Sequence, residues 1–234
     1  ADAVERLIEA ERPAVVLNCI GVVKQMAQGQ DPLTAIPVTA LFPHRVAKAC
    51  ADSGARLIHF STDCVFSGRA GPYSEASPPD PADVYGRTKL LGEVNAPNAL
   101  TLRTSIIGHE LGEGTGFLAW VLRSKGTRVS GYARALYTGV TTDYMARAVA
   151  LLISDFPQLC GVWHFASDPI SKYDLLCLAN EIYQLQLSID RDETFVCDRR
   201  LDGSLLRLRT GIVPPTWKDM LVEMHANSQR SWGE

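Results

Sequence analysis

The sequence lacks the cysteine spacings that mark metal centres and redox pairs. It contains no C-x-x-C pair and no Cys/His cluster, and its 234 residues are enough to bury a core without disulfide support. We therefore predict reduced cysteines and no metal site. The six cysteines are Cys19, Cys50, Cys64, Cys160, Cys177 and Cys197.

An excess of basic charge and a long apolar run are also absent. The net charge is −3, which gives no basic field to attract nucleic acid. The longest apolar stretch, residues 14–23, is interrupted by Asn18 and is shorter than the roughly 20 residues of a membrane helix. The first residues do not pair a basic region with an apolar one, as a signal peptide would. These features predict a cytoplasmic protein that binds neither membrane nor nucleic acid.

Strand and helix patterns alternate along the chain. Apolar runs typical of buried parallel strands occupy residues 14–21, 56–61, 100–105 and 161–166. Helical periodicity fills the intervals, and Ser171-x-x-Asp174 resembles a capping box. His59 and His164 lie inside strand patterns and are predicted to be hydrogen-bonded core side chains. The alternation predicts an α/β fold with a mostly parallel sheet.

Polar residues follow the second predicted strand, where ligands bind in open parallel sheets. Thr62 lies there, and Tyr85 and Lys89 follow with the i, i+4 spacing that places two side chains on one face of a helix. An ammonium beside a phenol is expected to lower the tyrosine pKa, which suits a general acid or base, and Thr62 can bind the same substrate oxygen. The alternative for the isolated motif is a surface tyrosine over a solvated lysine.

Three segments carry a family resemblance: residues 61–68, 85–93 and 102–105. They resemble the extended short-chain dehydrogenase/reductase superfamily, and within it the dTDP-4-dehydrorhamnose reductase branch. The resemblance implies a Rossmann-like doubly wound parallel sheet with a small C-terminal substrate lobe. It places the nucleotide-binding domain at residues 1–168, with residues 111–140 contributing in part to the lobe, and the substrate lobe at residues 169–234.

The resemblance implies reduction of a keto group on a nucleotide-linked deoxysugar, in polysaccharide biosynthesis, with NADP or NAD as cofactor. Tyr85 would donate the proton, Lys89 would hold the nicotinamide ribose, and Thr62 would position the carbonyl. An epimerase or dehydratase of the same superfamily remains open, as do a regulatory subunit that keeps the fold, an inert fragment and a homodimer.

Further site residues come from the same resemblance. Arg199 and Arg200 suit a diphosphate, but they also suit a salt-bridged face beside Asp198 and Asp202. Lys24 can reach a substrate phosphate or remain a solvated loop residue. The cofactor set is Asn18, Cys19, Ile20, Gly21, Ser61, Tyr85, Lys89, Thr104, Ser105 and Ile106. The substrate set is Lys24, Asp63, Val65, Arg199 and Arg200.

The sequence departs from the family pattern in two places. No strand with a glycine-rich turn precedes residue 14, so we expect the first βαβ portion, with the residue that selects NAD or NADP, to be missing from this chain. The cluster Gly112-x-Gly114-x-Gly116 has the wrong spacing for a phosphate cradle and is predicted to be a flexible loop. Thr39 stands where the family commonly has Asn, which puts a proton relay through that position in doubt.

Overall fold

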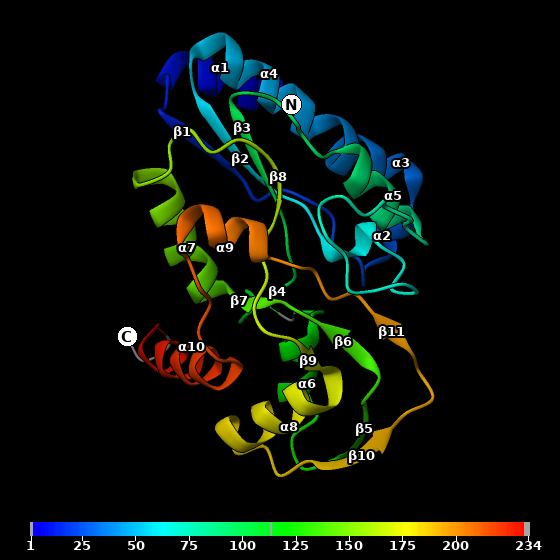
Figure 1. Cartoon of the computed structure of the whole chain (residues 1–234). Coiled ribbons are helices and arrows are strands. Elements are labelled where there is room, and N and C mark those ends of the chain that lie inside the picture. Colours follow the sequence, from blue (N-terminus) through cyan, green and yellow to red (C-terminus); the bar gives the residue numbers. More distant parts are fainter. Residues whose placement is uncertain (1, 113, 232–234) are drawn as a thin grey trace. The chain divides into compact units, whose positions relative to one another are not determined.

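The computed structural model describes residues 2–112 and 114–231, which form two compact units (Figure 1). Unit 1 takes the chain up to Ser67 together with Ser74–Thr104 and Leu152–Phe165. Unit 2 takes Gly68–Tyr73, Ser105–Leu151 and the chain from Ala166 onward. The units are therefore interleaved, whereas we predicted the ranges 1–168 and 169–234, with residues 111–140 contributing in part to the second. The reason is that short strands in 105–151 pair with strands after residue 169.

Unit 1 contains a parallel sheet of four strands in the order β1-β2-β3-β8. Each strand falls within one residue of a predicted apolar run, which confirms the α/β class with a parallel sheet. The strands are β1 (Val15–Asn18), β2 (Arg56–Phe60), β3 (Ala99–Arg103) and β8 (Gly161–His164).

The position of each strand in the sheet determines its burial. All five residues of β3 are buried, as are the three central residues of β2. By contrast β1 lies at an edge of the described sheet, and its Leu17 remains 46% exposed. The prediction of a fully buried first strand was therefore wrong, because an apolar run alone does not separate central from edge strands.

Helices of unit 1 cover the sheet. A core cluster contains Ile8 of α1 (Asp2–Glu11), Val46 and Cys50 of α4 (Phe42–Ser53), and Leu57 of β2. Gly54, at φ 74°, adopts the left-handed conformation that ends the fourth helix. The helical elements are α1 (Asp2–Glu11), α2 (Ala27–Gln30), α3 (Pro32–Ala35), the π-helix η1 (Ile36–Leu41), α4 (Phe42–Ser53), the 3₁₀ turn η2 (Asp63–Val65) and α5 (Val84–Leu91).

Unit 2 combines short strands with five helices in the described residues. Its core includes Val121, Leu176 and Leu187. The expected capping box is present, since Ser171 Oγ accepts a hydrogen bond from Asp174 N at 2.9 Å. The strands are β4 (Ile106–Ile107), β5 (Arg128–Tyr132), β6 (Ala135–Tyr137), β7 (Val140–Thr141), β9 (Ile170–Ser171), β10 (Ser188–Asp192) and β11 (Cys197–Asp198). The helices are α6 (Phe117–Arg123), α7 (Thr142–Ser154), α8 (Lys172–Tyr183), α9 (Ser204–Thr210) and α10 (Trp217–Ser231).

Three further observations concern the described residues. None of their helices has the length and apolarity needed to cross a membrane. The six cysteines, all within the described ranges, form no disulfide. No group of three His, Cys, Asp or Glu side chains among these residues is arranged to hold a metal ion.

Candidate functional site

The chain turns sharply where β2 ends. Thr62 is extended, with φ −144°, and its Oγ1 accepts a hydrogen bond from Cys64 N at 3.1 Å. This capping contact starts the 3₁₀ turn η2 and holds Thr62, only 7% exposed, directly after the strand. The local sequence therefore fixes a hydroxyl at the carboxyl end of a central strand, where open α/β sheets bind ligands.

Helix α5 brings two more predicted residues to the same place. Asp83 caps the helix by accepting a hydrogen bond from Gly86 N at 2.8 Å. Tyr85 lies close enough to Thr62 for the threonine side chain to lower the pKa of its phenol. One turn later, Lys89 Nζ donates to Phe60 O at 2.6 Å. The structure thus brings Thr62, Tyr85 and Lys89 together at the end of β2.

The tyrosine at this site keeps its proton. Burial raises the pKa of Tyr85, and the nearby Cys64, Asp63 and Asp83 raise it further, whereas the Thr62 side chain lowers it. The expected lowering by Lys89 was wrong, because the ammonium is bound to the Phe60 carbonyl and burial of the phenol dominates. At neutral pH Tyr85 is therefore a phenol, the form that can donate a proton.

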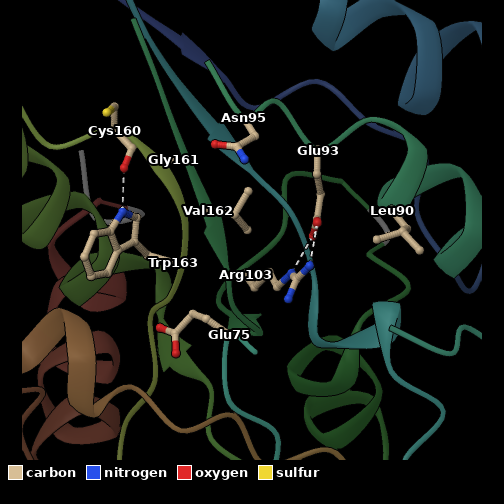
Figure 2. A pocket seen from close by; sticks show the side chains of 9 residues that line it. All are labelled: Glu75, Leu90, Glu93, Asn95, Arg103, Cys160, Gly161, Val162 and Trp163. Atoms are coloured by element: carbon tan, nitrogen blue, oxygen red, sulfur yellow. Dashed lines mark hydrogen bonds and ion pairs between the residues drawn. The ribbon is translucent and has the colours of Figure 1, made fainter. Parts of the chain in front are cut away.

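Lys89 is a buried cation with a carboxylate nearby. Burial lowers its pKa to about 8, while Glu93 acts in the opposite direction. Glu93 is hydrogen-bonded to Ser61 Oγ at 2.7 Å, and Arg103 binds both of its carboxylate oxygens at 2.7 Å. Figure 2 shows this pair on the wall of a hollow of about 620 Å³. No role for Glu93 was predicted, although its i, i+4 spacing from Lys89 is typical of two oppositely charged side chains on one face of a helix.

Arg103 is held from its other side as well. Its NH1 lies 3.3 Å from Nε2 of His164, and its guanidinium lies 5.3 Å from the centroid of the Phe66 ring. His164 is in turn fixed through its main-chain N–H, which donates to Glu75 at 3.0 Å. The predicted core role of His164 is consistent with its full burial and this hydrogen bonding.

The π-helix η1 packs against α5. Thr39 lies in this helix, and its Oγ1 is 2.6 Å from Ala35 O and 2.9 Å from Thr88 Oγ1. The Thr39 carbonyl leaves no space for a side chain at residue 92, which explains the glycine there. Thr39 therefore joins η1 to α5 between Tyr85 and Lys89, and the sequence pattern gave no sign of the π-helix.

The predicted cofactor residues fall into exposed and buried groups. Cys19, Ile20 and Gly21 are exposed after β1. Asn18 is buried, and its Oδ1 accepts from Ile20 N at 3.1 Å while its Nδ2 faces His59 Nδ1 at 3.1 Å. Burial lowers the pKa of His59 to about 3, so this core histidine is neutral.

The other predicted cofactor residues divide between the units. Ser61 is 6% exposed, and its hydroxyl donates a hydrogen bond to Glu93. Any contact with a cofactor would therefore come from the backbone of Ser61. Thr104 ends the unit 1 segment, and its buried hydroxyl has no hydrogen-bond partner among the described residues. Ser105 and Ile106 belong to unit 2, where Ser105 O accepts from Val140 N at 2.9 Å and Ile106 is 41% exposed in β4.

Two predicted substrate residues in unit 1 have other structural roles. Val65 is fully buried, so its side chain is not exposed to a substrate, and its assignment as a substrate contact stays a prediction. The burial arises because η2 turns this side chain into the core. Lys24 forms a 2.7 Å ion pair with Asp83, the cap of α5, and is not a solvated loop residue. Asp63 is 8% exposed and lies near enough to Tyr85 to raise its pKa.

The arginines predicted to bind a diphosphate lie in unit 2. Arg200 binds both oxygens of Asp198, at 2.8 and 2.6 Å. Arg199 donates its main-chain N–H to Leu136 O at 2.9 Å. For Arg200 the structure therefore favours the salt-bridged alternative, and a substrate role for the two residues remains a prediction.

The site in unit 1 has donors that suit the nicotinamide–ribose half of a dinucleotide. Among the described residues, the Lys89 ammonium, which can donate three hydrogen bonds, donates one to Phe60 O. The buried Thr104 hydroxyl has no hydrogen-bond partner among these residues. A phosphate cradle is not offered by the glycine loop of unit 2. There, the main-chain N–H groups of Thr115 and Gly116 donate to Glu110, at 2.9 and 2.6 Å.

Comparison with known proteins was informative. The family model described as the RmlD substrate binding domain matches residues 1–230. A dTDP-4-dehydrorhamnose reductase of Mycolicibacterium smegmatis is 38% identical over 128 residues, which are 52% of this chain and 38% of that protein. The methionine adenosyltransferase 2 subunit beta of Xenopus tropicalis is 26% identical over 203 residues, which are 80% and 60% of the two chains.

A solved structure is similar over almost the whole chain. It is described as a dTDP-4-dehydrorhamnose reductase from Clostridium acetobutylicum, with a TM-score of 0.83, 25% identity, and coverage of 97% of this chain and 85% of that one. The chain spans between 38% and 60% of the length of three curated relatives that it matches.

Proposed function

The chain belongs to the RmlD substrate binding domain family, and we propose that it carries the proton-donating half of an NAD(P)-dependent keto reductase. The proposed substrate is a 4-keto deoxysugar linked to a nucleotide, the class named by the dTDP-4-dehydrorhamnose reductase relatives. The observation that carries the proposal is the meeting of Thr62, Tyr85 and Lys89 where β2 ends.

The proposed chemistry divides the work among these three side chains. A bound nicotinamide cofactor would supply a hydride to the carbonyl carbon. Tyr85 would then give its phenolic proton to the oxygen as the C=O double bond becomes a C–OH single bond. Thr62 would hydrogen-bond the same oxygen, and Lys89 would hold the ribose hydroxyls and stabilise the phenolate until it regains a proton from solvent.

The cofactor residues proposed here are those that the structure leaves available for contact. The exposed backbone of residues 19–21, the unpartnered Thr104 hydroxyl and the Lys89 ammonium would contact the nicotinamide half. Arg199 and Arg200 are proposed to contact the substrate diphosphate, and Arg200 would have to leave its pair with Asp198 to do so. We further propose a cytoplasmic location for the protein.

The test is NADPH and NADH oxidation by the protein with dTDP-4-keto-6-deoxy sugars. We expect loss of absorbance at the reduced-nicotinamide band in proportion to alcohol formed. An epimerase would instead convert the sugar without net consumption of cofactor. Absence of turnover with every 4-keto nucleotide sugar would overturn the reductase assignment.

A second function is favoured by one observation, the similarity to a protein described as a subunit of methionine adenosyltransferase. In that case the fold would serve as a binding partner without turnover. Tryptophan fluorescence quenching by NADP separates the two, because a binding subunit would retain cofactor affinity while showing no oxidation of NADPH.

A further inference from the structure

We propose that Glu93 is a positioning residue for Lys89: its carboxylate, fixed by Ser61 and Arg103, keeps the buried ammonium at the end of β2 charged. The proposal deepens the proposed function and rests on it, because it is in that reaction that Lys89 acts. Glu93 itself would touch neither substrate nor cofactor.

The backbone after α5 gives Glu93 its position. Although the helix ends at Leu91, Gly92 N still bonds Thr88 O at 3.0 Å and Glu93 N bonds Leu90 O at 3.2 Å. The helical turn therefore continues through Glu93. Residues four apart in such a turn lie on one face, so Glu93 lies on the face of Lys89.

Both side chains reach the same end of β2. Lys89 donates to the carbonyl of Phe60, and Glu93 accepts from the hydroxyl of Ser61, the next residue. A cation bound to one carbonyl in a buried place is poorly compensated, since neutral dipoles replace only part of its hydration. A carboxylate bound one residue along the strand supplies the missing negative charge.

Arg103 prevents Glu93 from changing its position. The two side chains are 8% and 7% exposed, and the guanidinium binds both carboxylate oxygens. His164 and Phe66 hold the guanidinium from behind. In Figure 2 the pair lies on one wall of the hollow, with Glu75 as a separate carboxylate on the lining. Glu93 is thus a fixed charge that acts on Lys89 through space.

The charges around Lys89 can be assigned element by element. Glu93 follows α5, His59 lies on β2, and Arg103 on β3 stands behind Glu93. His59 is neutral because its pKa is lowered to about 3, chiefly by burial. From η1, Thr39 contributes only a hydroxyl. Among the described residues, Glu93 therefore supplies the negative charge that favours the charged form of Lys89.

The experiment measures the titration of Lys89 itself, in the chain as it stands. The ε-amine can be followed by NMR of ε-labelled lysine, with Lys89 assigned by its loss in Lys89→Met. In Glu93→Gln we expect the midpoint to fall by about one pH unit, so that the ratio of neutral amine to ammonium at pH 7 rises about tenfold. Glu75→Gln is the matched control, because it removes the same charge from the same hollow and should leave the midpoint unchanged.

A second variant covers the risk that Glu93→Gln unfolds by leaving Arg103 unpaired. Glu93→Gln/Arg103→Gln removes both charges, and the Lys89 midpoint should again fall. An unchanged midpoint in the folded variants overturns the proposal, and so does an equal fall in Glu75→Gln. These readouts require no turnover, so a failure of the reductase assay would leave them intact and would point to the proposed function instead.

Discussion

The end of β2 and the arginine-rich segment after β11 differ in how their cations are paired with carboxylates. At the end of β2, Lys89 is buried and its ammonium contacts one carbonyl, with its nearest compensating carboxylate held by another cation. After β11, Arg200 is 30% exposed and is bound at two points by Asp198, two residues earlier in the chain.

The Lys89 ammonium is therefore available to bind a ligand, whereas the Arg200 guanidinium is already neutralised by an ion pair. A buried cation is costly unless something compensates it, so its retention in a core suggests a role beyond stability. A partly exposed pair between neighbours contributes little to stability and indicates little about function. The comparison can be tested at each of its elements.

The largest expected effect is on turnover. Replacing Tyr85 with Phe removes the proton donor but keeps the ring, so kcat should fall about a thousandfold while cofactor affinity stays nearly constant. Steady-state kinetics and NADP binding measure the two quantities. Tyr132→Phe, an exposed tyrosine of unit 2, is the control. Full activity in Tyr85→Phe would remove the acid–base assignment.

The buried ion pair should show the next largest effect, on stability. Arg103→Leu leaves the Glu93 carboxylate buried without its partner, which should lower the free energy of unfolding by about 3–5 kcal/mol. Glu93→Leu/Arg103→Leu should lower it much less, because no charge is left behind. Urea unfolding of both variants measures the difference, and equal losses would show that the pair acts only by packing.

Lys89 should make stability depend on pH. Its pKa is about 8 in the folded chain and 10.5 ordinarily, so between these values the unfolded chain holds a proton that the folded chain has lost. Stability contributed at this position therefore rises with pH across that window. The stability advantage of Lys89→Met over the native chain should shrink from pH 8 to pH 10. Urea unfolding at each pH measures it, and a constant advantage would contradict the depressed pKa.

The smallest effect belongs to the exposed pair. Arg200→Gln should change the free energy of unfolding by less than about 1 kcal/mol, because surface ion pairs contribute little. Arg200→Gln should also leave the KM for the nucleotide sugar nearly unchanged, because Asp198 already neutralises this charge. A marked rise in KM would show that the Asp198 pair opens when substrate binds, and the contrast drawn above would then fail.

The sequence predicted the features that depend on local pattern. Apolar runs located all four strands of the unit 1 sheet, and the i, i+4 spacing placed Tyr85 and Lys89 on one face of α5. Both patterns can be interpreted from the sequence, because the periodicity of side chains in strands and helices follows directly from backbone geometry.

The features that the sequence did not reveal depend on contacts between distant residues. The pKa of Tyr85 depends on burial as well as on its neighbour at i+4. The π-helix around Thr39 is recognisable only once it packs on Thr88. Arg103 is ten residues from Glu93, and only the pairing of β2 with β3 brings it to the carboxylate. The burial of Val65 likewise needed the turn η2 to be seen.

The interleaving of the two units has a consequence for synthesis. The chain passes five times from one unit to the other, and β8, the last strand of the unit 1 sheet, begins only at Gly161. When synthesis has passed Leu151, Tyr85 and Lys89 are already part of the chain. The strand β8, which pairs with β3 beside Arg103, is not yet made. The sheet of unit 1 therefore cannot be completed until two segments of unit 2 have been synthesised, and no single cut of the gene separates the two units.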